Sequence, residues 1–497
     1  MAPHPLRRLA ASGLAYQASG VVAGVLALVT LPLYTSHLSE GELGWAEVLL
    51  TWIILLSIVV RGGLQEALLR HWFHDEDPVR RARLARRVVV LVAAASTVVA
   101  GAVLLAAAPL AEVVLDDGGR EATATVRAAA LGIWAFTNLE VLNALLRAQE
   151  ARRTYLRASL SNVGLTVGTT VLLVVVLDQG APGYLLGNYL ASVAVLLGLW
   201  WSQRELLLGH RGPDGPGVPM RALWRFGLPT VVPEVTVFLL TVVDRQWLLQ
   251  EAGSDAAGVY AAAVKLATLV IVVARAFQAA WPPLAYDLPA EQAPPVYAQV
   301  VRLYVALLGT VVAAIALLRH EICDLLLGDG FSPAAKDAAA EALPWLALGW
   351  ALWGLTWVFT SIAGRAHATG RTLPAAVLGL VVNVLVLAWL VPDHEATGAA
   401  LALVAAYVVA LGLAHLRTRR LLRVPFDHAR MLAAAVVLVA LVLAGDAVLP
   451  GGGVDGWAAR LAGCAALLPA VVLAGGVRRD ELQGLRAALA ARRASRS

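Results

Sequence analysis

The run Val48-Leu-Leu-Thr-Trp-Ile-Ile-Leu-Leu-Ser-Ile-Val-Val60 is almost entirely apolar, and Arg61 follows it directly. The surrounding segment, residues 45–68, is long enough to cross a bilayer as an α-helix, which takes about 20 mostly apolar residues. The same criterion finds about 14 such segments along the chain. They lie near residues 11–35, 45–68, 88–115, 122–146, 158–177, 183–203, 226–250, 258–285, 302–318, 344–363, 374–391, 398–416, 431–449 and 457–476.

Composition supports an all-α integral membrane protein. The 497 residues are 59% hydrophobic and only 15% charged, against roughly 25% charged in an ordinary soluble domain. The mean hydropathy is +0.73, and a soluble exterior cannot hide that much apolar surface. Disorder, collagen-like structure and a secreted disulfide scaffold are excluded. Two cysteines, Cys323 and Cys464, are too few for a disulfide framework or a zinc site, and we predict neither a metal nor a cofactor.

The basic residues predict the orientation in the membrane. The net charge of +5 does not indicate a nucleic-acid partner, because the basic residues cluster in short loops between apolar segments. With the N-terminus inside, the outer loops hold only Arg120, Arg319 and Lys336, and most of the other Arg residues lie in inner loops and tails. The positive-inside rule then places both termini in the cytoplasm. The Arg-, Ala- and Leu-rich composition favours a bacterial cytoplasmic membrane.

The chain contains an internal repeat with an offset of about 215 residues. Gly44 in the first outer loop corresponds to Gly258, and the stretch Asp178-Gln-Gly-Ala-Pro-Gly183 corresponds to Asp393-His-Glu-Ala-Thr-Gly398. We therefore expect two six-helix bundles around a central cavity, with two helices added at the end. The predicted parts are a first bundle at 1–208, a Gly/Pro linker at 209–221, a second bundle at 222–418, helices 13 and 14 at 431–476, and a basic tail at 477–497.

Three cations inside predicted spans are the first candidates for a binding site: Arg61, Lys265 and Arg275. Each would cost about 2.5–3.5 kcal/mol near a bilayer centre, so we expect them to line a water-filled cavity. Arg61 and Arg275 are one repeat apart. Such a cavity would attract an anion such as phosphate or pyrophosphate, which Arg binds through two parallel hydrogen bonds. The alternatives are that Arg61 extends to the interface and that Lys265 pairs with an acid on a neighbouring helix.

Four further charges are candidates for the cavity wall or for gating: Glu66, Glu234, Asp244 and Arg245. Glu234 and Arg245 are eleven residues apart, so a continuous helix would place them on nearly the same face. They are either counter-charges across one cavity wall or a structural pair. Arg460 lies near the outer end of its span, and we expect it to extend to the interface.

The sequence contains no motif for catalysis. A Walker A loop, a GxSxG nucleophile elbow and a metal-spaced His or Cys cluster are all missing from it. The outer loops are short, which disfavours a membrane glycosyltransferase or polymerase. We therefore predict a transporter and not an enzyme.

Several motifs resemble one known family. They are Leu31-Pro-Leu-Tyr34-Thr-Ser-His-Leu38-Ser-Glu-Gly-Glu-Leu-Gly44, Trp224-Arg-Phe-Gly-Leu-Pro229, Asp244-Arg245, Gly258-Val-Tyr260, Lys265-Leu-Ala and Phe277-Gln-Ala-Ala-Trp-Pro282. In this order they resemble the bacterial polysaccharide biosynthesis, or lipid-linked oligosaccharide flippase, family of the multidrug/oligosaccharidyl-lipid/polysaccharide exporter superfamily. The resemblance covers about residues 5–425.

The resemblance implies a flippase that moves a polyprenyl-(pyro)phosphate-linked oligosaccharide from the cytoplasmic to the outer leaflet by alternating access. It also implies that cavity cations hold the pyrophosphate, that helices 13 and 14 help to accommodate the lipid tail, and that glycosyltransferases and a polymerase of the same pathway are partners. Two alternatives stay open. One is a drug or cation antiporter of the same superfamily, which would need carboxylates in the cavity, and the other is a flippase for a peptidoglycan lipid precursor.

Overall fold

The computed structural model describes residues 22–209, 218–240, 242–451 and 453–476, and these residues contain helices and no strand. Twelve helices are long and apolar enough to cross a membrane, and the shorter apolar helix Val22–Thr35 precedes them. The helices are α2 Glu40–Arg61, α3 Leu64–His74, α4 Pro78–Leu105, α5 Ala107–Leu115, α6 Arg120–Ala148, α7 Arg152–Thr170 with a π-helical end at Val171–Val176, α8 Gly180–Ser202, α9 Arg204–Leu208, α10 Met220–Leu240, α11 Val243–Leu266, α12 Thr268–Asp287, α13 Ala293–Leu317, α14 Arg319–Leu326, α15 Pro333–Arg365, α16 Leu373–Thr418, α17 His428–Val448 and α18 Gly453–Leu473.

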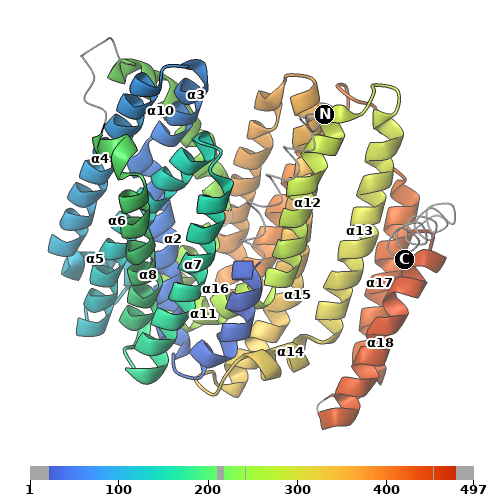
Figure 1. Cartoon of the computed structure of the whole chain (residues 1–497). Coiled ribbons are helices and arrows are strands. Elements are labelled where there is room, and N and C mark those ends of the chain that lie inside the picture. The colour runs from blue at the N-terminus through green and yellow to red at the C-terminus, as the bar shows by residue number, and fades with distance from the viewer. Residues whose placement is uncertain (1–21, 210–217, 241, 452, 477–497) are drawn as a thin grey trace, which may run out of the picture.

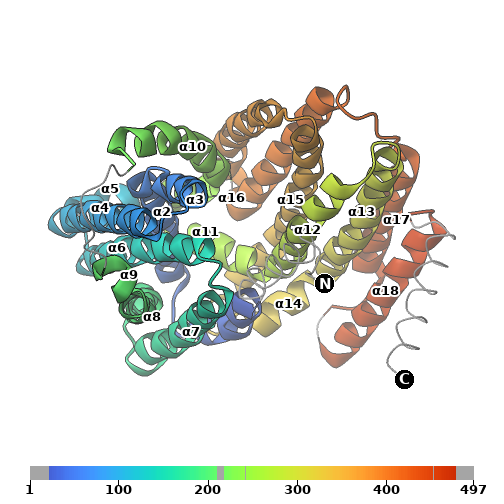
Figure 2. The same ribbon diagram turned by 45° about the horizontal axis from the view of Figure 1, so that its top comes forward.

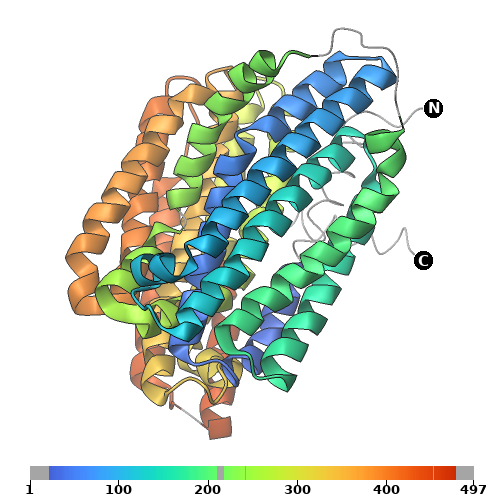
Figure 3. The same ribbon diagram turned by 90° about the vertical axis from the view of Figure 1, so that its left-hand side faces the viewer.

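The helices form two groups, which lie on the left and the right of Figure 1. In the first lobe, α6 packs against α2, α4 and α8, and α7 packs against α8. In the second lobe, α15 packs against α11, α12, α13 and α16. The hairpin of α17 and α18 lies on the outside of α13, at the edge of the second lobe (Figure 2). The helices of the first lobe run side by side with their axes nearly aligned (Figure 3), as in an antiparallel helix bundle.

The breaks between helices differ from the predicted span limits for local reasons. Predicted span 45–68 ends early, because Gly62 and Gly63 adopt the left-handed backbone conformation that stops α2. Trp224 and Gly227 of α10 pack directly onto these glycines, where any side chain would clash. Predicted span 258–285 is likewise divided between α11 and α12 at Ala267. The predicted count of about 14 spans stays a prediction.

Two turns correspond to each other in the way that the predicted repeat requires. Gly180, the first residue of α8, has φ of 54°, and Glu395, inside α16, has φ of 41°. The two residues are 215 positions apart, which is the offset found in the sequence. At 1.5 Å per residue, the 46-residue α16 would be far longer than a bilayer core, and the kink at Glu395 divides it into two segments that can each cross.

Buried ion pairs attach the last hairpin to the second lobe. Arg460 of α18 lies 3.0 Å from Glu321 and 3.6 Å from Asp446, and it donates to the carbonyl oxygen of Leu317 at 2.6 Å. Arg319 pairs with the same Asp446 at 2.8 Å. Arg460 is only 6% exposed, so its side chain is fixed inside the protein. We had expected it to extend to the interface, and the acids on α14 and α17, which the linear sequence does not place beside it, explain the difference.

We expect Arg460→Leu to lower the free energy of unfolding by about 3–5 kcal/mol, because the change leaves the buried Glu321 carboxylate without its partner. Thermal or denaturant unfolding in detergent micelles measures the loss. Arg430→Leu is the matched control, since Arg430 pairs with Asp427 on the surface and its side chain is 45% exposed. If both variants lost the same free energy of unfolding, the buried ion pairs of Arg460 would not be what attaches the hairpin to the second lobe.

Candidate substrate cavity

A cavity of about 690 Å³ lies against the first lobe. Its wall comes from helix Val22–Thr35, α2, α6, α7 and α8, and it is completed by α10 and α11. Charged and polar side chains line much of it: Tyr34, Glu47, Thr51, Glu140, Asn143, Tyr155, Ser159, Asn162, Tyr184, Asn188, Tyr189, Ser192, Arg245 and Lys265. A cavity with this lining suits a polar ligand.

The centre of the charge in this cavity is Glu47. Its carboxylate lies 2.6 Å from the Lys265 ammonium and 3.9 Å from the Arg245 guanidinium. Lys265 also donates to the Tyr184 hydroxyl at 3.1 Å, and Arg245 donates to the Thr51 hydroxyl at 3.3 Å. Two cations against one carboxylate give this group a formal charge of +1. We call these residues, Glu47, Arg245 and Lys265, the cavity charge cluster.

Arg61 belongs to a separate ion-pair group at the end of α2. Its guanidinium lies 3.5 Å from Glu234 and 3.9 Å from Glu140, and it donates to the Ser57 carbonyl oxygen at 3.1 Å and to Gln65. Arg61 is 5% exposed and is absent from the residues that line the cavity, whereas its partner Glu140 lines it. The sequence had linked Glu234 to Arg245, but the structure gives each of them a different partner.

The other candidate residues are not part of the cavity charge cluster. Arg275 on α12 is exposed and has no ion-pair partner among the residues that the structure describes. Glu66 is half-buried near the start of α3. Asp244 is 1% exposed and accepts hydrogen bonds from the Tyr260 hydroxyl and from the backbone N–H of Arg245. None of these three lines the cavity.

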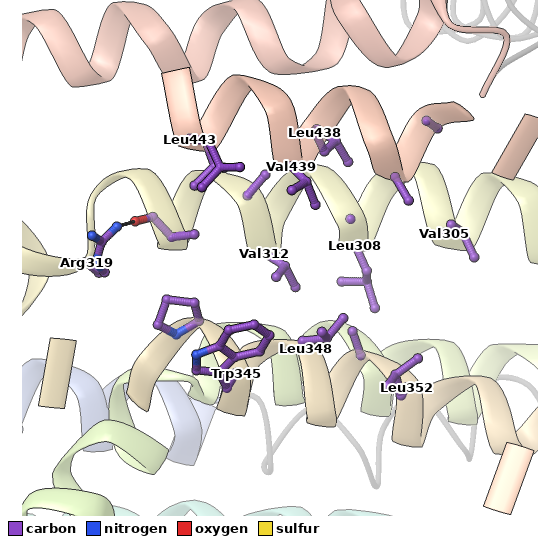
Figure 4. Close-up of a pocket in the computed structure, with 18 of the residues that line it drawn as sticks. Val305, Leu308, Val312, Arg319, Trp345, Leu348, Leu352, Leu438, Val439 and Leu443 are labelled. Atoms are coloured by element: carbon purple, nitrogen blue, oxygen red, sulfur yellow. Dashed lines mark hydrogen bonds between the residues drawn. The ribbon is translucent and has the colours of Figure 1, made fainter. Parts of the chain in front are cut away.

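A second hollow, a groove of about 660 Å³, runs between α13, α15 and α17. Its lining is almost wholly apolar: Val305, Leu308 and Val312 of α13 face Leu348 and Leu352 of α15, and Leu438, Val439 and Leu443 of α17 close it (Figure 4). Arg319 lies at one end of it (Figure 4), and Glu341 and Trp345 also line it. The lining suits a hydrocarbon chain.

The two lobes are joined tightly at the end that carries residues 36–39, 116–119 and 327–332. We call it the outer end, because the orientation predicted from the sequence places it outside the cell. There α2 and α11 meet at two glycines: a Cβ on Gly44 would lie 2.1 Å from the Ser254 carbonyl oxygen, and one on Gly258 would lie 1.8 Å from that of Glu40. Hydrogen bonds add to this closure. Gly328 N–H donates to the Thr35 hydroxyl at 2.7 Å, and Trp52 donates to Gln246 at 2.6 Å. Gly44 and Gly258 are the pair that the sequence repeat had matched.

Sequence reasoning missed Glu47, although the signal was available. The argument that an ionisable residue inside a span is costly had been applied to the cations, and it holds equally for an acid within the apolar α2. Glu140, which pairs with Arg61, also lies inside a predicted span, but no role could be assigned to it from the sequence. The aromatic and amide lining contributed by α7 and α8 carries no charge and gives no comparable signal.

Comparisons with known proteins agree with this fold. The family model described as polysaccharide biosynthesis protein matches residues 9–287, which is more than half of the chain. A comparison with curated protein sequences finds no match. Among solved structures, the chain is similar to the lipid II flippase MurJ in an inward closed conformation, at 11% identity and a TM-score of 0.72, over 92% of this chain and 97% of that one.

The chain is also similar to two other transporter structures. An inward-facing multidrug resistance MATE transporter of the MOP superfamily has 16% identity and a TM-score of 0.64, over 82% of this chain and 94% of that one. A MOP superfamily transporter from Pyrococcus furiosus has 15% identity and a TM-score of 0.55, over 84% and 96%. At these identities the likeness shows the fold. The family match places this chain in the polysaccharide biosynthesis protein family, and its long apolar helices make it a multi-pass membrane protein.

Proposed function

We propose that the protein is a flippase that moves a polyprenyl-(pyro)phosphate-linked oligosaccharide from the cytoplasmic to the outer leaflet of a bacterial cytoplasmic membrane, with both chain termini in the cytoplasm. The observation that carries this proposal is that one molecule holds a cavity with the cations Arg245 and Lys265 and many polar side chains in its lining, and a separate apolar groove. A ligand that needs both has an anionic, hydrophilic head and a long hydrocarbon tail.

The groove supports the tail of such a ligand. It follows α13 from Tyr304 to Ala316, which corresponds to about 18 Å of helix at 1.5 Å per residue. Its lining offers no charge along this length until Arg319 and Glu341 are reached. A polyprenyl chain lying there would bury apolar surface on α13, α15 and α17, which includes one of the two helices added after the second bundle.

The cavity supports an anionic and sugar-bearing head. Lys265 and Arg245 would attract its phosphate groups. The amides of Asn162 and Asn188 and the ring of Tyr155 line the same cavity. Amides donate and accept hydrogen bonds, as sugar hydroxyls require, and aromatic rings pack against the apolar faces of sugars. The pathway's glycosyltransferases and polymerase are the partners that such a substrate implies.

A drug or cation antiporter fits the cavity less well. Its cationic substrate would need carboxylates that are free to bind it, and Glu47 is already paired with two cations. A peptidoglycan lipid precursor would use the same cavity and groove chemistry, so the mass of the cargo must separate that function from the one proposed.

The test combines deletion of the gene with a variant that fills the groove. We expect cells without the gene to accumulate a polyprenyl-linked oligosaccharide, seen by mass spectrometry of extracted lipids, and the parent protein to reverse this. Val312→Trp with Leu348→Trp should reduce the rescue about tenfold, because the tail loses the apolar surface that it buries. Leu468→Trp, on an exposed position of α18, should rescue fully.

Other results identify other functions. Accumulation of a peptidoglycan precursor in the deleted cells would assign the protein to that pathway. Loss of dye or drug efflux without any lipid-linked sugar would favour the antiporter. Full rescue by the groove-filling variant would show that the tail does not occupy this groove.

A further inference from the structure

The cavity charge cluster connects the two lobes. Glu47 belongs to α2, which packs within the first lobe, and Lys265 and Arg245 belong to α11, which packs against α15 and α16 of the second lobe. All three side chains are largely buried, with exposed fractions of 7% for Glu47, 16% for Arg245 and 20% for Lys265. The 2.6 Å pair between Glu47 and Lys265 is therefore an ion pair across the interface between the lobes.

This ion pair lies directly inside the closed outer end. Glu47 is three residues after Gly44, and Lys265 is seven residues after Gly258, so the pair lies about one to two helical turns from the glycine contact. The Tyr184 hydroxyl of α8 accepts a hydrogen bond from Lys265 and fixes the ammonium at this depth. The cavity begins at the same residues, because Glu47, Arg245 and Lys265 all line it.

An anionic ligand in the cavity must compete with Glu47. Within the described part of the chain, Lys265 and Arg245 are the only cations in the cavity lining. A phosphate or pyrophosphate that binds them takes the partners that Glu47 has in the structure. Removing one partner of a buried ion pair is strongly destabilising, because a charge is left buried and unpaired.

We propose that Glu47 is a built-in substitute for the substrate's phosphate: it holds α2 to α11 at the outer end while the cavity is empty, and the bound phosphate displaces it. The displaced carboxylate is then stabilised only by water, which reaches it when the outer end opens. Ligand binding thus favours opening toward the outside. The identity of the displacing anion rests on the proposed function, whereas the closure by Glu47 does not.

The test measures how often the outer end opens. Gly41 is buried there against Ser254, so alkylation of Gly41→Cys by a membrane-impermeant maleimide reports the open fraction, in a protein carrying Cys323→Ala and Cys464→Ala. We expect Glu47→Gln to raise the labelling rate about tenfold without ligand. Polyprenyl pyrophosphate should raise the rate of the parent by a similar factor and add little to that of Glu47→Gln. Inorganic pyrophosphate shows whether the anion alone suffices.

The control and a second variant keep the result interpretable. Glu140→Gln removes another carboxylate from the same cavity, but its partner Arg61 lies within the first lobe, so labelling should not change. Glu47→Gln with Arg245→Gln and Lys265→Gln buries no unpaired charge of this cluster, and it should raise labelling even if the single variant fails to fold. Unchanged labelling in both Glu47 variants would overturn the proposal. A different result would separate the two parts of the proposal. If labelling rose in the variants but the parent responded to neither pyrophosphate, closure of the outer end by Glu47 would stand and the proposed substrate would be wrong.

Discussion

Gly41→Cys together with Ser254→Cys should stop transport completely under oxidising conditions and allow it to resume on reduction. A Cβ on Gly41 would lie 3.4 Å from the Ser254 Cβ, close to the 3.5–4.5 Å of natural disulfides. The bond would join α2 to α11 across the lobes and hold the outer end closed. A transporter that alternates between two open states cannot complete a cycle when one of them is blocked. Translocation of a fluorescent polyprenyl-linked sugar in proteoliposomes measures the effect.

Each single cysteine variant is the control for this experiment. Both should transport at near the parent rate in oxidant, because neither can form the bond, and both should carry Cys323→Ala and Cys464→Ala. Cross-linked protein that still moves substrate would show that the lobes need not separate at this end. Such a result would contradict alternating access through the α2–α11 contact.

Most of the fold could be predicted from the sequence, because the membrane imposes a length and an apolar composition on every span. The predicted all-α membrane fold is confirmed by the helices and by the family match. The breaks at Gly62 and Ala267 could not be placed, whereas the kink at Gly253 inside α11 lies between the predicted spans 226–250 and 258–285. A glycine within an apolar segment is compatible with an unbroken helix. The helix ends there only when another helix packs onto the glycine. Trp224 on Gly62 is such a case.

The partners of the buried charges were less predictable. The cost of burying a charge points to Lys265 and Arg61 from the sequence alone, but the identity of each partner depends on which helices meet. For Lys265 the sequence had left two readings open, a cavity residue or a partner of an acid on a neighbouring helix. Both describe it, since it lines the cavity and pairs with Glu47. Whether Arg61, Arg275 or Lys265 binds substrate stays a prediction.

The repeat did not predict the environment of the two arginines. Arg61 and Arg275 are 214 positions apart, yet Arg61 is buried between two glutamates and Arg275 is exposed. A sequence offset relates positions along the chain. It does not fix the neighbouring helix, and the two lobes place different acids there. The first predicted helix up to residue 21, most of the linker at 209–221 and the tail at 477–497 lie outside the described residues.

Neutralising the cavity charge cluster should abolish most transport. In Glu47→Gln with Arg245→Gln and Lys265→Gln, no charge is left buried without a partner, so the protein should still insert and fold. A hydrogen bond to a charged group contributes about 1.5–3 kcal/mol, and the loss of two should reduce transport at least about 100-fold. Proteoliposome translocation of the same fluorescent substrate measures this.

The matched control is Arg127→Gln, on an exposed position of α6, because it changes the net charge by the same amount as the triple variant while leaving the cavity intact. It should transport at near the parent rate. Glu47→Gln alone separates the two roles of the cluster: it keeps both cations and should bind the pyrophosphate head at least as tightly as the parent, since the competing carboxylate is gone. If the triple variant transports at the parent rate, the phosphate is held elsewhere, and Arg275 is the next cation to remove.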